Sequence, residues 1–166
     1  NNEKIKDPIN ILYILGPGHC GSTLLNLCLD RHSSVIGVSE IISLNRKLPG
    51  WSGDDYVLKN YFWSKVNHKM KEKYGLPISA IPFDLNLAQT TKEIALHHNK
   101  LALKTILDIS EKSIISDSSK NPNRLDDLLG SKLFNVRVIY LVRDGRAVVH
   151  SYRRKYNSFF VGWRNL

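Results

Sequence analysis

The sequence predicts an α/β fold in which a parallel β-sheet is flanked by helices. Three apolar runs of strand length are each followed by a loop and then by a segment with helical periodicity. This repeated order is typical of parallel sheets with helices on both faces. A chain of 166 residues with 42% hydrophobic content can bury one sizeable core, so we expect a single domain over residues 1–166.

The first predicted strand is Ile9–Leu15, a nearly continuous apolar run that ends in Gly-Pro-Gly. Such runs are typical of strands that are buried on both faces. Apolar residues then follow at positions 24, 25, 28 and 29, a helical spacing that predicts a helix beginning at Ser22. The chain therefore opens with a strand, a glycine loop and a helix.

Two longer helices are predicted in the middle of the chain. Over residues 54–73, apolar side chains recur every four residues with Lys and His between them, which is the pattern of an amphipathic helix. Residues 85–109 repeat the pattern less cleanly, and Gly75, Pro77 and Pro82 mark the connection before them.

The other two predicted strands are residues 113–117 and 136–142. A short helix is predicted over Pro122–Leu129, because proline is well tolerated in a first helical turn. Gly145–Tyr156 is predicted as a helix whose residues 148, 149 and 152 share a face. In parallel sheets ligands bind at the carboxyl ends of strands, where polar residues follow all three runs at positions 16–23, 117–120 and 143–146.

The loop GPGHCGSTLL, residues 16–25, has the spacing of a phosphate-binding loop, with Ser22 where a triphosphatase has lysine. Its glycines allow successive backbone amides to turn toward one anion. The N-terminus of the following helix adds free N–H groups and the positive end of the helix dipole. We predict that the loop binds phosphate; an ordinary tight turn capped by Ser22 is the alternative.

Three classes of enzyme use such a loop. A kinase or nucleoside triphosphatase would lack its phosphate-binding lysine here, although Asp117 could imitate a metal-holding aspartate. A cysteine phosphatase is suggested by His19-Cys20 but disfavoured, because Asn26 stands where its arginine is expected. The third class transfers a sulfuryl group from a nucleotide that carries a 5′-phosphosulfate and a 3′-phosphate.

The segments GPGHCGSTLLNLCLDRH and VIYLVRDGRAVVHSY together resemble the two cofactor-binding signatures of P-loop sulfotransferases that use 3′-phosphoadenosine-5′-phosphosulfate (PAPS). The second segment is especially similar to that of protein-tyrosine sulfotransferases, and the run DSSK is similar to bacterial-type members. The resemblance covers residues 11–152, with 48–112 only loosely matched. It implies transfer of a sulfuryl group from PAPS to a hydroxyl or amine acceptor, release of adenosine 3′,5′-bisphosphate (PAP), and no metal.

The resemblance also implies binding roles for individual residues. Arg143 and Ser151 would bind the 3′-phosphate, and a forked, permanently charged guanidinium suits that task. A surface salt bridge between Arg143 and Asp144 is the alternative. The 5′-phosphosulfate would be bound by backbone amides and hydroxyls of the loop that comprises Gly18, His19, Cys20, Gly21, Ser22, Thr23 and Leu24.

Two residues depart from the family pattern, since His19 replaces an Arg or Lys and Cys20 replaces a Ser. A protonated His19 could donate to sulfuryl or phosphate oxygens, and a bound dianion would raise its pKa, so we expect activity to fall at high pH. Lys120 could instead supply the missing cation.

Sulfuryl transfer requires in-line positioning, and negative charge develops on the departing phosphate oxygen. His19, the backbone amides of the glycine loop and Lys120 are the predicted stabilisers of that charge. Glu40 is the predicted base, because it occupies the position of the catalytic glutamate of the tyrosine enzymes. A carboxylate that merely starts a helix after Ser39 is the alternative.

The net charge of +9 indicates an anionic partner, which fits a nucleotide cofactor and leaves a basic nucleic-acid-binding module as an alternative. Lys and Arg are spread along the whole chain without an aromatic-basic repeat, so we expect that the protein binds no nucleic acid.

We expect no membrane segment in this sequence, and two sparse cysteines favour the cytoplasm. The missing initiator methionine leaves a Golgi-type lumenal or anchored form open, and the apolar end FFVGWRNL suggests a fold cut at its C-terminal side.

Overall fold

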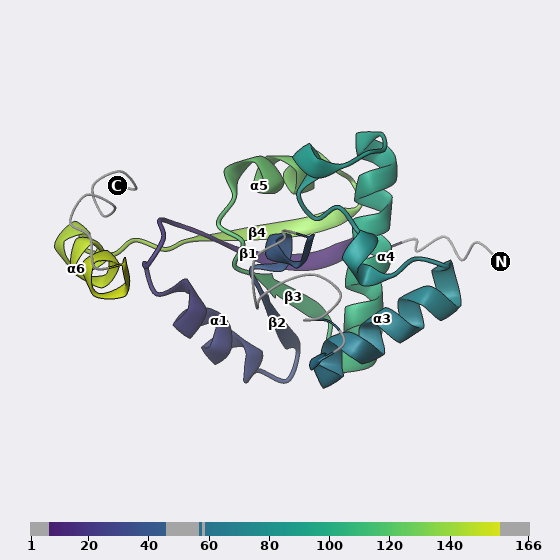
Figure 1. Ribbon diagram of the computed structural model, residues 1–166, viewed down its shortest axis with the longest axis horizontal. Coiled ribbons are helices and arrows are strands. Elements are labelled where there is room, and N and C mark those ends of the chain that lie inside the picture. Colours follow the sequence, from purple (N-terminus) through teal and green to yellow (C-terminus); the bar gives the residue numbers. More distant parts are fainter. Residues whose placement is uncertain (1–6, 46–56, 58, 157–166) are drawn as a thin grey trace.

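A computed structural model describes residues 7–45, 57 and 59–156 of the chain (Figure 1). At its centre lies a sheet of four parallel strands in the order β2-β3-β1-β4. The predicted α/β class with a parallel sheet flanked by helices is therefore confirmed. The strands are β1 (Ile9–Leu15), β2 (Val35–Ser39), β3 (Ile114–Asp117) and β4 (Phe134–Tyr140).

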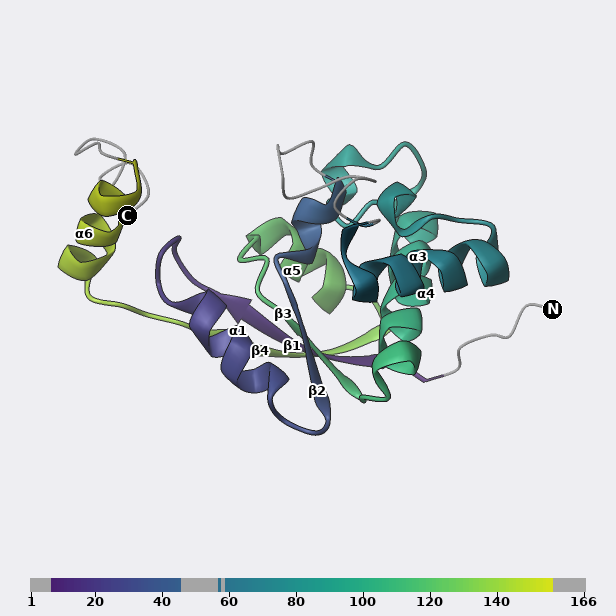
Figure 2. The ribbon, with the colours of Figure 1, turned by 60° about the horizontal axis from the view of Figure 1, so that its bottom comes forward.

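Helices lie on both faces of the sheet and bury most of β1. The helix α1 (Ser22–Asp30) contacts β2 and β3 on one face, where the Ser116 hydroxyl donates to Asn26 at 2.7 Å. On the other face α4 (Lys92–Ser110) contacts β1 and β3, and α5 (Pro122–Leu129) contacts β4. The helix α3 (Tyr61–Tyr74) packs outside α4 (Figure 2).

The main hydrophobic core lies between the sheet and the layer of α3, α4 and α5. Alternate residues of β1 point into this core, in line with the two-residue period of a strand. Burying each large apolar side chain contributes about 1.5–3 kcal/mol to stability. The largest fully buried side chains include Ile11, Tyr13, Met70, Phe83, Leu103 and Ile115.

Helix capping explains where the structure differs from the predicted helix bounds. Within the helix predicted over residues 54–73, residues 57 and 59 are helical, and a separate helix begins at Tyr61, because the Asn60 side chain caps it by accepting from two backbone amides; residues 54–56 and 58 lie outside the described part. The helix predicted over 85–109 begins at Lys92 after the cap Thr91, and a short 3-10 turn occupies Leu85–Leu87. The helices predicted over Pro122–Leu129 and Gly145–Tyr156 have the predicted bounds.

The strand prediction missed β2 and shifted β4. β2 is a short strand that contains Gly37, so its sequence has little strand character. β4 spans 134–140 instead of 136–142, and residues 141–144 run on as an extended connection to α6 (Gly145–Tyr156).

β4 lies at one edge of the described sheet, and α6 lies beyond the carboxyl ends of the strands (Figures 1 and 2). Val138 and Tyr140 of β4 are 44% and 67% exposed. Within residues 7–45, 57 and 59–156, no helix has both the length and the apolar character that a membrane span requires.

Candidate active site

The glycine loop after β1 and the connection after β4 lie side by side, because β1 and β4 are neighbouring parallel strands. The Leu141 amide donates to the Leu15 carbonyl at 2.8 Å, which extends the strand pairing up to the loop. Gly16 is required at this point, since a Cβ atom there would lie 2.5 Å from the Leu141 carbonyl oxygen.

The backbone of the glycine loop turns through two left-handed residues, His19 with φ 61° and Gly21 with φ 101°. A left-handed conformation at a residue other than glycine costs about 1–3 kcal/mol and persists only where neighbouring contacts hold it. Behind the loop, Cys20 and Ser22 are buried, whereas Thr23 and Leu24 are exposed at the start of α1.

His19 joins the glycine loop to α6 through side chain and backbone. Its imidazole Nδ1 lies 2.9 Å from the Ser151 hydroxyl oxygen, and its carbonyl accepts from Arg143 Nη1 at 2.8 Å. The imidazole also stacks on the Tyr152 ring, with the ring centroids 4.0 Å apart. The structure thus brings together the three predicted residues His19, Arg143 and Ser151.

The surroundings of His19 are electropositive. Burial lowers the pKa of its imidazole below the ordinary value of 6.5, and the charges of Lys155, Lys120 and Arg143 lower this pKa further. A neutral imidazole is therefore favoured before any anion arrives.

A cavity of about 320 Å³ lies between the glycine loop and α6. Several of its lining side chains are basic, which suits an anionic ligand. Prediction from sequence missed Lys155, although Ala147, Ser151 and Lys155 repeat every four residues and so share one face of a helix. The lining comprises His19, Arg143, Ala147, His150, Ser151, Arg154 and Lys155.

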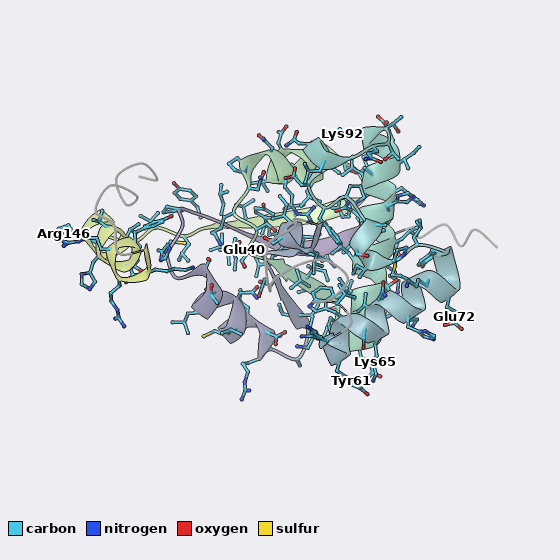
Figure 3. All side chains as sticks on the ribbon, viewed as in Figure 1. Glu40, Tyr61, Lys65, Glu72, Lys92 and Arg146 are labelled. Atoms are coloured by element: carbon cyan, nitrogen blue, oxygen red, sulfur yellow. The ribbon has the colours of Figure 1, made fainter. Side chains whose placement is uncertain are left out.

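Glu40 and Lys120, which follow β2 and β3, form an ion pair with each other. Ser39 and Lys120 both have left-handed backbone angles, with φ 54° and 56°, and turn the two loops toward one another. Glu40 immediately precedes a 3-10 helix over Ile41–Asn45, which is the helix-start position named above as the alternative to a catalytic base. Its carboxylate also pairs with Lys120, a predicted catalytic residue. Figure 3 shows Glu40 near the middle of the molecule.

Asp117 is not placed to hold a metal ion. Its side chain is 0% exposed and accepts from Arg124 Nε at 2.9 Å, and Arg124 itself is 3% exposed. Arg124 also donates to the Phe83 carbonyl at 2.8 Å and to the Asn99 side chain at 3.0 Å. The aspartate that could imitate a metal-holding residue is therefore committed to a buried ion pair, which prediction from sequence missed.

Asp144 is paired with Arg146 at 2.8 Å rather than with Arg143. Hydrogen bonds from the Arg146 side chain and backbone lower the pKa of the Asp144 carboxyl. This local pair braces the turn before α6 and leaves the Arg143 guanidinium directed at the glycine loop. Among the described residues, His, Cys, Asp and Glu side chains form no group of three that could hold a metal ion.

Comparison with models of known protein families gave no match, and comparison with curated protein sequences gave none. Among solved structures, the chain is similar to the sulfotransferase domain of the olefin synthase from Synechococcus PCC 7002, with a TM-score of 0.51 and 18% sequence identity. The match covers 98% of this chain and 59% of that domain's chain, so this chain spans about three fifths of its length. At this identity the likeness supports a sulfotransferase-like fold.

Proposed function

We propose that this protein is a sulfotransferase that moves a sulfuryl group from PAPS to a hydroxyl or amine acceptor. The observation that carries the proposal is that the glycine loop and the Arg143–Ser151 segment meet around one basic cavity. A nucleotide with phosphate groups on both its 5′ and 3′ positions is the ligand that uses both elements.

The residues on each side of the cavity fit the two ends of such a nucleotide. Backbone amides of residues 18–24 and the N-terminus of α1 would hold the 5′-phosphosulfate. Arg143 and Ser151, with Lys155 one turn further along α6, would hold the 3′-phosphate. Because ATP has no 3′-phosphate, the second group of residues would separate the two nucleotides.

Glu40 is the proposed base, and Lys120 and His19 are the proposed cationic partners of the transferred group. In the reaction, the acceptor oxygen or nitrogen forms a bond to sulfur while the bond between sulfur and the phosphate oxygen breaks. Glu40 would take the acceptor proton, and the donor would leave as PAP. The Glu40–Lys120 ion pair supports this assignment because it holds both side chains at the carboxyl ends of the strands, where the glycine loop also lies.

A kinase is the runner-up, and two observations count against it. The loop lacks the lysine that binds the β- and γ-phosphates, and Asp117 is held by Arg124 inside the core.

We also propose a cytoplasmic location, since Cys20 and Cys28 are both free thiols.

Calorimetric titration with PAP and with ATP–Mg²⁺ tests the proposal. We expect PAP to bind more tightly, and Arg143→Ala to weaken PAP by roughly tenfold to a hundredfold, because a charge-assisted hydrogen bond to phosphate is lost. Arg137→Ala, which removes an exposed arginine from β4, is the matched control. Preference for ATP–Mg²⁺ together with no effect of Arg143→Ala would show that the proposal is wrong.

A further inference from the structure

Tyr152 and Val148 are the two buried side chains among the described residues of α6. The next residues, Arg153, Arg154 and Lys155, are exposed, whereas Tyr152 is 8% exposed. A helix that lies apart from the sheet, as α6 does in Figures 1 and 2, has few places in which to bury a large ring. Tyr152 is therefore one of the places where α6 contacts the rest of the molecule.

The Tyr152 ring packs against the glycine loop at two consecutive residues. It stacks on the His19 imidazole with the ring planes tilted by 45°. It also fills the space next to Gly18, where a Cβ atom would lie 2.1 Å from the tyrosine hydroxyl oxygen and 3.2 Å from Cζ. A side chain at position 18 would therefore collide with Tyr152, which explains the glycine there.

We propose that Tyr152 is a positioning residue that sets the separation between the glycine loop and α6, so that one nucleotide can bridge the two anion sites. The inference rests on the proposed function and goes beyond it, because Tyr152 acts through His19, Gly18 and Ser151 and is not assigned a contact with the nucleotide. The ring lies against His19, whose backbone is in the left-handed region.

Bridging makes the proposal testable. When two half-sites are held at the right distance, a ligand that spans both gains affinity that neither half-ligand has, because the second contact becomes intramolecular. PAP spans both sites, AMP offers only a 5′-phosphate, and adenosine 3′-monophosphate offers only a 3′-phosphate. Loss of positioning should therefore weaken PAP selectively.

Calorimetric titration of Tyr152→Ala with these three nucleotides is the test. We expect PAP affinity to fall by roughly tenfold or more, and the two monophosphates to change by no more than about twofold. Tyr152→Phe keeps the ring and should bind PAP as the unaltered protein does. Tyr61→Ala, which removes an exposed tyrosine from α3 (Figure 3), should also leave PAP affinity unchanged.

A second pair of variants tests the Gly18 contact itself. Gly18→Ala must displace the tyrosine hydroxyl, so we expect it to weaken PAP. In Gly18→Ala/Tyr152→Phe that hydroxyl is gone and the nearest ring atom lies 3.2 Å from the new Cβ, so PAP affinity should recover in large part. A purely local structural defect at Gly18 would not be relieved by removing one oxygen from α6.

The titrations distinguish failure of the positioning role from failure of the proposed function. Unchanged PAP affinity in Tyr152→Ala, or an equal loss for all three nucleotides, overturns the positioning role while the proposed function stands. If the unaltered protein binds PAP no more tightly than AMP, the proposed function is wrong, and so is this inference.

Discussion

His19 and Ser151 are 132 residues apart in the sequence, yet their side chains lie within hydrogen-bond distance at 2.9 Å. This contact joins the loop after β1 to the helix after β4. Burial, together with the positive charges around it, lowers the pKa of the imidazole and favours its neutral form in the free protein. A bound anion reverses that preference, because negative charge stabilises the imidazolium.

PAP binding should strengthen as the pH falls. The pKa of His19 is below 6.5 in the free protein and is raised by a bound dianion, so binding takes up a proton between the two values. Calorimetric titration across pH 6 to 8 measures this slope. His19→Gln should flatten the slope. The phosphate's own titration affects both proteins alike, so the difference between their two slopes belongs to His19, and an unchanged slope would show that another group is responsible.

Glu40→Gln should slow sulfuryl transfer without weakening PAP. A general base contributes about 10²–10⁴-fold to rate, and the amide can no longer take the acceptor proton. The measurement is turnover with radiolabelled PAPS and a panel of hydroxyl and amine acceptors, alongside PAP titration. Glu72→Gln, on α3 in Figure 3, is the control for loss of an acidic side chain far from the glycine loop.

Arg124→Met should destabilise the protein by about 3–5 kcal/mol, because it leaves the fully buried Asp117 carboxylate without its partner. Urea unfolding measures the change. Lys104→Met, which breaks an exposed pair with Asp108 on α4, should cost no more than about 0.5 kcal/mol. Similar losses in the two variants would contradict a special role for the buried pair.

Gly16→Ala should weaken PAP binding as well as stability. The new Cβ would lie 2.5 Å from a backbone oxygen, which cannot rotate away, so the glycine loop must move relative to β4 at a cost of about 1–3 kcal/mol. Gly75→Ala is a matched comparison: its Cβ would meet nothing within 4 Å, and its φ of 69° costs about 1–2 kcal/mol in backbone strain alone. Only Gly16→Ala should change PAP affinity.

The sequence pattern predicted most of the fold because local signals mark most of its elements. The apolar run of β1, the proline that opens α5 and the shared apolar face of α6 are all local, and the structure has these elements. β2 was missed because five residues with a central glycine carry almost no local signal. Its pairing with β3 depends on contacts between distant segments, which no single window of sequence contains.

The candidate site was predictable in its parts but less so in its arrangement. The glycine loop and Arg143 follow recognisable strands, so their place at the carboxyl ends could be inferred. The pairing of Glu40 with Lys120 depends on β2 lying next to β3, which the sequence does not state. The burial of Asp117 depends on Arg124, seven residues away in α5, and arginine is a residue type that is rarely buried unless it is paired.

The open edge of β4 has a consequence for how copies of this protein behave in solution. Among the described strands, β4 pairs only with β1, and its sequence FNVRVIY contains one charged residue, Arg137. An unpaired strand edge with exposed apolar side chains is a template for aggregation. The net charge of +9 opposes this by mutual repulsion, which salt screens over about 8–10 Å. The positive charge that would attract the proposed nucleotide also opposes association between copies, and raising the ionic strength should weaken both effects together.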